Sequence, residues 1–209
     1  SLNVTSIIYS ENEAAFLAGY SAALASKSGR VAMVTTPSNA DGYENGFLLG
    51  VSAAKKNVRP FVKYTATESV VSAKALISLG IDVIYDATTG SADGLFEAIV
   101  KANTAKNRKK NAPEVNLIIT EPDLYLSVTP ATFKYLIASV VKRVDIAVSA
   151  IIGKAINNSQ LSDVIDAKAG IYGQRYGISN KGLEIVIKSK TLAAQSAAIN
   201  AAASAAYAN

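Results

Sequence analysis

Acidic, hydroxylated and glycine residues gather between residues 85 and 94, where an apolar run gives way to a helical pattern. The stretch reads YDATTGSADG, and Phe96, Ile99 and Val100 follow it at helical spacing. Loops that lead from a strand into a helix bind ligands in open α/β sheets, because helix amides point outward there. The spacing Gly90-x-x-x-Gly94 fits neither the dinucleotide pattern nor the Walker loop. The stretch therefore predicts a site for a small ligand other than a nucleotide phosphate.

The chemistry open to this chain is narrow. The sequence has no His, no Cys and one Met, which excludes zinc sites of the usual kind, thiolate nucleophiles and imidazole bases. A carboxylate pair or a metal site could be drawn from four residues: Asp82, Asp86, Asp93 and Asp123. Asp82 opens its strand, and the other three are better explained as caps and ligand acceptors. We therefore expect no enzyme, no metal and no cofactor.

Length and charge are those of a globular protein. The chain has 209 residues, 50% of them hydrophobic, and a net charge of +5. No apolar run approaches membrane-spanning length, and the first residues lack the features of a signal peptide. The one dense basic cluster, KNRKKN at 106–111, has no interleaved aromatics. A solvated loop is favoured there over nucleic acid or anionic lipid, and we expect no nucleic-acid partner.

Short apolar runs alternate with helical segments through the first 120 residues, which indicates an α/β fold with a parallel sheet. The expected strands are 4–9, 30–35, 58–64, 81–85 and 115–120. Ser10 and Glu13 form the pattern of a capping box at the start of the first helix. Asn39 or Asp41 is expected to cap a second helix, and a third is expected over 68–79.

The apolar pattern of the second half of the chain differs from that of the first 120 residues. Periodic apolar residues predict one long helix from Thr129 to about Asn157, and they are Phe133, Ile137, Val141, Val144 and Val148. Two short strands or a hairpin follow over 169–187. The Ala-rich tail carries few large apolar residues, namely Leu192, Ile199 and Tyr207. It predicts a peripheral helix or a frayed end, with docking on a neighbouring subunit as the alternative.

Four stretches in register resemble the basic membrane protein family of extracytoplasmic substrate-binding lipoproteins, which includes purine-nucleoside binders of ABC-type importers. They are AAFLAGYSAALASKSGRVAMV (14–34), YENGFLLGVSAAKK (43–56), DVIYDATTGSADGLFEAI (82–99) and VVKRVDIAV (140–148). The resemblance implies a type I periplasmic-binding-protein fold, in which two α/β lobes close on a small molecule. Residues 1–121 would form a nearly complete second lobe, 122–190 part of the first lobe, and 191–209 a C-terminal helix or tail.

The resemblance also implies the ligand contacts. Tyr85 would stack on the ligand, with Asp86 beside it, and a core aromatic is the alternative for Tyr85. The turn after it would contribute Gly90, Ser91 and Asp93, and helix-dipole stabilisation is the alternative for Asp93. Asp123 keeps the place of a family acid that grips ligand hydroxyls. Lys142 matches a family Lys near the ligand, and a solvated helix position is its alternative.

In family members, further sequence precedes the stretch that corresponds to 14–34. That preceding sequence forms most of the first lobe. Without that lobe, the stripe of Phe133, Ile137, Val141 and Val144 would be bare. We therefore expect it to be covered by a further segment of the same polypeptide, by a second chain or another copy, or by a rearranged fold in which the Ala-rich tail takes part. The main expectation for function is an extracytoplasmic or membrane-associated solute-binding protein for a nucleoside-like or small polar ligand, with an importer permease as partner. The alternative is a self-assembling cell-surface protein built on this scaffold through residues 129–157 and the tail.

Overall fold

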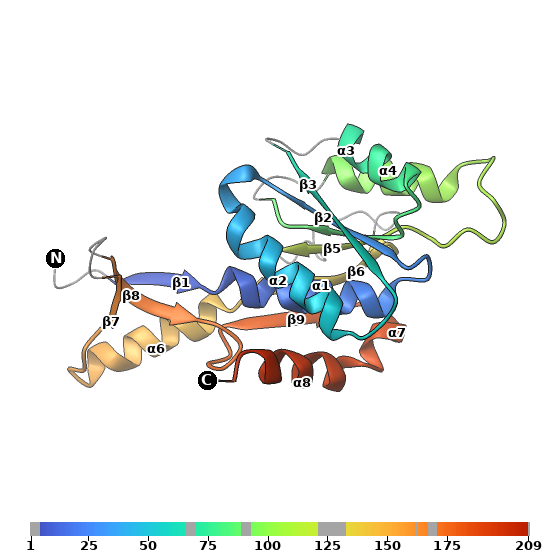
Figure 1. Ribbon diagram of the computed structural model, residues 1–209. Coiled ribbons are helices and arrows are strands. Elements are labelled where there is room, and N and C mark those ends of the chain that lie inside the picture. The colour runs from blue at the N-terminus through green and yellow to red at the C-terminus, as the bar shows by residue number, and fades with distance from the viewer. Residues whose placement is uncertain are drawn as a thin grey trace.

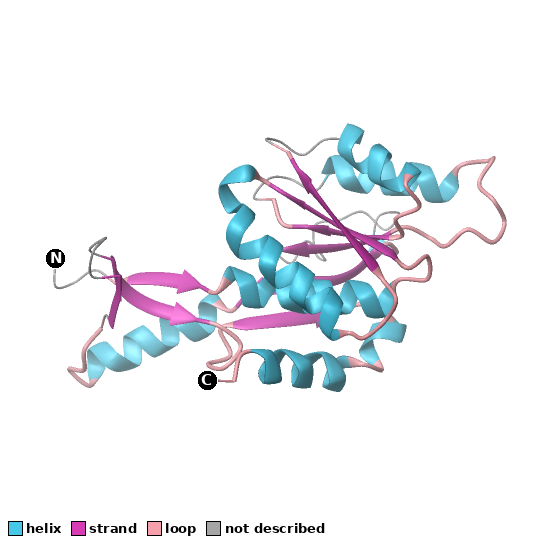
Figure 2. Ribbon diagram, viewed as in Figure 1, coloured by secondary structure: helices cyan, strands magenta, loops and turns pink. Residues whose placement is uncertain are grey.

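The computed structural model describes residues 5–65, 70–88, 93–120, 133–161, 163–166 and 171–208. Its largest part is a six-stranded sheet between two layers of helices (Figures 1 and 2). The sheet has the order β3-β2-β4-β5-β6-β9. The strands are β2 (Arg30–Thr35), β3 (Arg59–Tyr64), β4 (Val83–Asp86), β5 (Asn116–Thr120), β6 (Leu136–Lys142) and β9 (Leu183–Ile187). All neighbours are parallel except β6 and β9, so the predicted α/β class and the first strands are confirmed.

Side chains alternate between the two faces of the sheet, as the pleat requires. On β2, Met33 packs with α1 (Glu11–Ala25) and α2 (Ala40–Ala53), whereas Val34 packs with α3 (Val70–Ser78) and α4 (Asp93–Thr104). The short helix η1 (Pro37–Asn39) leads into α2. Both faces are therefore buried, which explains why the central strands are almost continuously apolar.

A second, three-stranded sheet lies at one end of the molecule (Figure 1). Its order is β1-β8-β7, from β1 (Ser6–Tyr9), β8 (Ile171–Tyr176) and β7 (Asp163–Asp166). The helix α6 (Val144–Ile156) runs beside it. The two short strands expected over 169–187 are confirmed as β8 and β9, and the hairpin alternative is wrong because these strands belong to different sheets.

The predicted long helix from Thr129 to Asn157 is wrong over residues 136–142. Residues 136–142 form β6, pair with both β5 and β9, and join the large sheet, so that sheet draws strands from both sides of the expected boundary at 121. Ile137 is buried in the core, and Phe133 and Val141 are half-buried. The predicted helix is confirmed over Val144–Ile156, which form α6, and α6 begins after Arg143.

The exposed apolar stripe therefore has other members than expected. Along α6, four aliphatic side chains recur every fourth residue and are 53%, 42%, 53% and 74% exposed: Val144, Val148, Ile152 and Ile156. Ala147 is the only fully buried residue of this helix. We call this set the α6 stripe. It has the spacing of a helix face that normally packs against another element.

The Ala-rich tail packs on its own chain. It forms α7 (Lys190–Ala193) and α8 (Ser196–Ala206), and Leu192 and Ile199 are fully buried. The Tyr207 hydroxyl donates to the Asn12 carbonyl at 3.1 Å, and its ring meets Phe16 edge-on at 5.6 Å. The tail is thus a peripheral helix against α1, as the first reading expected, and these contacts keep it from fraying.

Helices α1 and α2 approach each other through glycines. A Cβ added at Gly46 would lie 2.0 Å from the Asn12 carbonyl oxygen, and one at Gly50 would lie 2.3 Å from that of Phe16. Gly19 opposes the Phe47 carbonyl in the same way, at 2.3 Å. Only residues without a side chain permit this contact, because real Cβ atoms do not come so close to backbone atoms.

We expect Gly50→Ala to lower the free energy of unfolding by about 2 kcal/mol or more, since α1 and α2 must separate to admit the methyl group. Gly153→Ala is the matched control, because a Cβ there meets nothing within 4 Å. It should stabilise α6 by about 0.5 to 1 kcal/mol through helix propensity. Urea unfolding followed by circular dichroism measures both changes. Equal stability of the two variants would contradict the close contact.

Candidate functional site

The candidate site lies at one edge of the six-stranded sheet. Because β2, β4, β5 and β6 are parallel, their carboxyl ends share that edge, at Thr35, Asp86, Thr120 and Lys142. Helices α2 and α4 start from the same side, so their amide ends point there. The structure thus brings Asp86, Asp93 and Lys142 to one edge. Gly90, Ser91 and Asp123 lie outside the described residues.

Tyr85 lies in the core beneath this edge. Its ring is fully buried and stacks on Phe47, with centroids 5.9 Å apart and an interplanar angle of 18°. Its hydroxyl forms a hydrogen bond with the Thr120 hydroxyl. Burial, followed by the nearby Tyr43, raises the pKa of Tyr85 well above its ordinary value. The structure therefore places Tyr85 in the core, which was the alternative role expected from the sequence. A contact between Tyr85 and the ligand stays a prediction.

Asp86 ends β4 and shapes the turn that follows. Its Oδ1 accepts from the Thr88 amide at 2.9 Å and from the Thr88 hydroxyl at 2.7 Å, and both residues are buried. This is the hydrogen bonding of an Asx turn, in which the carboxylate replaces a backbone acceptor two residues before the donor. Thr88 was not predicted, although the spacing Asp-x-Thr after a buried strand is a usable signal.

Asp93 opens α4 and is exposed. A carboxylate at the first turn of a helix is stabilised by the helix dipole, which agrees with the second reading of this residue. Its exposure also leaves the carboxylate accessible from solvent. Strand β4 therefore ends with a buried acid that fixes residues 86–88, and α4 begins with an exposed one.

Lys142 ends β6, two strands away from β4. Strands lie about 4.8 Å apart, so the ends of β4 and β6 are separated by about 10 Å. The Lys142 ammonium lies 5.6 Å from the centre of the Tyr9 ring, which is within range of a cation–π interaction. Tyr9 meets Tyr176 in turn, with centroids 5.9 Å apart. Sequence reasoning missed both tyrosines, although each is the last residue of its strand.

Arg143, the next residue, has a structural role. It forms ion pairs of 2.7 Å with Asp145 and with Glu184. Hydrogen bonding from Arg143 lowers the pKa of the exposed Asp145 to about 2. These pairs fix the link between β6 and α6 and leave Lys142 as the cation directed at the tyrosines.

Hydrogen bonds join the segments that cross between the two sheets. The Ser10 amide donates to the Tyr176 carbonyl at 2.9 Å, and the Ile178 amide donates to Glu13 Oε2 at 2.6 Å. The predicted capping box is therefore wrong, because Glu13 binds Ile178 and the Ser10 side chain forms no capping hydrogen bond. The Tyr176 hydroxyl completes the set by donating to the Ala147 carbonyl at 3.3 Å. Hydrogen bonds thus join the three segments that cross between the two sheets, beside Lys142. These crossing segments are 9–11, 142–144 and 176–183.

The arrangement offers groups that can bind a small polar ligand. Within the described ranges, no three carboxylates gather where a metal ion could bind. Asp86 is engaged by its own turn, and the edge offers helix amides, an exposed acid and a cation near aromatic rings. Such groups hold a small polar molecule by hydrogen bonds. In the same part of the chain, no helix is long and apolar enough to span a bilayer.

Solved structures with a similar fold include solute-binding proteins and transcription regulators. A transcriptional activator of the comK gene from Bacillus halodurans matches with a TM-score of 0.66 and 16% identity, over 97% of this chain and 66% of that one. An ABC transporter periplasmic solute-binding protein from Actinobacillus succinogenes with bound D-allose gives 0.57 and 16%, over 90% and 62%. Their likeness shows the fold: part of a type I periplasmic-binding-protein fold.

Sequence relatives give the family. A CD4+ T-cell-stimulating antigen of Listeria innocua is 32% identical over 70% of this chain and 43% of its own length. The ABC transporter nucleoside-binding protein BmpA of Lactococcus lactis is 29% identical over 50% and 32%, and basic membrane protein B of Borreliella burgdorferi is 27% identical over 76% and 45%. The chain thus spans less than half the length of these relatives. The model of the family "ABC transporter substrate-binding protein PnrA-like" matches residues 1–204. This chain belongs to that family, the basic membrane proteins.

Proposed function

We propose that this chain is the ligand-holding part of an extracytoplasmic solute-binding protein that carries a nucleoside-like or other small polar ligand to an ABC importer permease, without chemistry. The observation that carries the proposal is the turn after β4, which Asp86 and Thr88 fix and which leads to the exposed Asp93 at the start of α4. Family membership and a relative named as nucleoside-binding support it.

Each site residue has a role in this proposal. Asp93 accepts hydrogen bonds from ligand hydroxyls, and Lys142 approaches the ligand from the crossing segments. Gly90, Ser91 and Asp123 are proposed contacts on the resemblance alone. Tyr85 supports the turn from below, since its ring is enclosed by Phe47 and Thr120.

We propose further that another α/β unit covers the α6 stripe and faces the ligand from the opposite side. Two observations support this: the stripe is bare, and β1, at the edge of the small sheet, pairs only with β8 among the described strands. Burying a large aliphatic side chain contributes about 1.5 to 3 kcal/mol, so four of them favour a stable contact. The unit could belong to the same polypeptide or to a second one.

Nucleoside binding should appear as saturable amide shifts at residues 85–88, 93–95 and 142 when the full chain is titrated with guanosine, adenosine and ribose and followed by NMR. Asp93→Asn should weaken binding at least about tenfold, because a charged hydrogen bond is lost. Glu97→Gln is the control and should bind as wild type, because Glu97 is exposed one turn later on the same helix. Absence of saturable shifts at this edge, or equal loss in both variants, would overturn the proposal.

The α6 stripe should drive association of the isolated chain. Light scattering is expected to give a mass above 21.7 kDa that rises with concentration. The double variant Ile152→Asp and Ile156→Asp should remain a monomer with unchanged thermal stability, because both side chains are exposed. Leu49→Asp on α2 is the control, since Leu49 is also exposed but lies outside the stripe. A wild-type monomer that binds no hydrophobic dye would show that the stripe needs no cover, whereas open-ended particles would favour the assembly alternative.

A further inference from the structure

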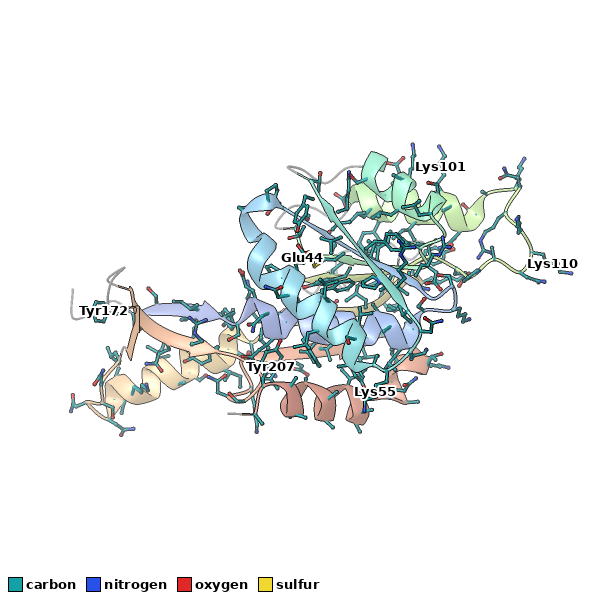
Figure 3. All side chains as sticks on the ribbon, in the orientation of Figure 1. Glu44, Lys55, Lys101, Lys110, Tyr172 and Tyr207 are labelled. Atoms are coloured by element: carbon teal, nitrogen blue, oxygen red, sulfur yellow. The ribbon has the colours of Figure 1, made fainter. Side chains whose placement is uncertain are left out.

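The edge of the six-stranded sheet opposite the candidate site is strongly basic. Six connections meet there: 26–29, 54–58, 79–82, 105–115, 133–135 and 188–190. The cations in them or next to them are Lys27, Arg30, Lys55, Lys56, Arg59, Lys106, Arg108, Lys109, Lys110, Lys134, Lys188 and Lys190. We call this surface the basic edge. Figure 3 shows Lys55 and Lys110 at this end of the sheet.

Backbone hydrogen bonds link four of these connections, those that precede β2, β3, β4 and β5. The Arg59 amide donates to the Gly29 carbonyl at 2.8 Å, and the Asp82 amide donates to the Arg30 carbonyl at 3.2 Å. The Asn116 amide donates to the Asp82 carbonyl at 2.8 Å, which brings in the connection before β5. The cations thus form one surface although they come from distant parts of the sequence.

Carboxylates do not balance this surface. The six connections contain two acids, Asp82 and Glu114. Asp82 is 2% exposed, and its oxygens accept from the Ser26 hydroxyl and from the amides of Lys27 and Ser28 at 2.6 to 2.8 Å. Glu114 pairs with Lys134 at 2.9 Å.

Part of the positive charge serves the fold. Arg30 donates to the Leu79 carbonyl, Lys56 to the Leu24 carbonyl at 3.2 Å, and Arg108 to the Ala112 carbonyl. Cations near helix carboxyl ends also offset the helix dipole. These roles do not account for Lys106, Lys109 and Lys110, which project into solvent from the connection after α4.

An apolar groove lies beside the basic edge. A cavity of about 310 Å³ runs between α3 and α4 over Ile77, Ala98 and Ala102, and Lys74 and Lys101 stand at its rim. Leu79, which follows α3, is 48% exposed. Apolar surface next to lysines matches the join between phosphate headgroups and acyl chains.

We propose that the basic edge and the groove between α3 and α4 form a docking surface for an anionic phospholipid membrane. The cations lie on several connections, and Lys106, Lys109 and Lys110 project into solvent, which suits a diffuse layer of phosphates better than one shaped protein ligand. Each Lys or Arg near such a layer contributes about 1 kcal/mol. The candidate ligand site is at the opposite edge, so docking leaves it uncovered by the bilayer. This proposal stands independently of the ligand and of any cover on α6.

Flotation with lipid vesicles tests the charge. The full chain should bind vesicles that contain one-third phosphatidylglycerol and should dissociate from them at high salt. It should not bind vesicles of pure phosphatidylcholine. Lys106→Glu, Lys109→Glu and Lys110→Glu together should reduce binding at least about tenfold. The matched triple variant Lys63→Glu, Arg175→Glu and Lys181→Glu changes net charge equally away from the basic edge and should bind as wild type. Equal loss in both triples, or no binding by wild type, would overturn the proposal.

Trp fluorescence tests the groove side. Because the chain has no Trp, the emission of an introduced Trp comes from that position alone. Leu79→Trp should shift its emission to shorter wavelength on phosphatidylglycerol vesicles, whereas Tyr172→Trp, exposed on the small sheet, should not. A shift at Tyr172→Trp alone would place the membrane contact elsewhere. Binding to polyglutamate without binding to vesicles would assign the basic edge to an acidic protein and overturn the membrane proposal.

Discussion

The close contact between α1 and α2 through glycines sets the position of most other elements. Gly19, Gly46 and Gly50 let backbone meet backbone, so the two helices form a thin, rigid layer on one face of the sheet. That layer holds Phe47 against Tyr85 and presents Phe16 to the tail. It also fixes Glu13, whose carboxylate extends from α1 and accepts a hydrogen bond from the Ile178 amide at the crossing segments. The large sheet, the tail and the link between the two sheets all contact this pair of helices.

The candidate site follows from topology more than from any single motif. Parallel strands bring Asp86 and Lys142 to one edge although 55 residues separate them in the numbering, and the antiparallel β9 returns the chain beside β6. The crossings then place Tyr9 and Tyr176 next to Lys142. A ligand at this edge would touch both a fixed turn and the segments that join the two sheets, so binding and any movement between the sheets would be coupled.

Sequence reasoning succeeded where burial produces a simple pattern. Strands covered on both faces are continuous apolar runs, so 30–35 was predicted with the observed bounds of β2 and the other early strands within about two residues. It failed over 136–142, where a helix was predicted and a strand is found, because Phe133, Ile137 and Val141 recur every fourth residue and no Gly or Pro marks the change at Arg143. The burial that makes 136–142 a strand comes from β5 and β9, which local periodicity does not register.

The site residues show the same limit. The resemblance pointed to the edge where Asp86, Asp93 and Lys142 lie, but the enclosure of Tyr85 depends on Phe47 from α2 and Thr120 from β5. Glu13 has the spacing of a capping box, yet a backbone amide 165 residues later takes its carboxylate. Tertiary partners of this kind outweigh local preferences, and a single sequence does not reveal them.

The contact between Tyr207 and Asn12 also bears on how the chain folds as it is made. The two residues are 195 positions apart, so α1 emerges from the ribosome long before the helix that covers it. Strand β9, which closes the sheet on β6, also arrives late. Until then Phe16 and the outer side of β6 lack their last neighbours, and contacts between distant residues form slowly. The nascent protein would therefore pass through a stage with open apolar surface and an unpaired strand edge, which are the features that chaperones protect.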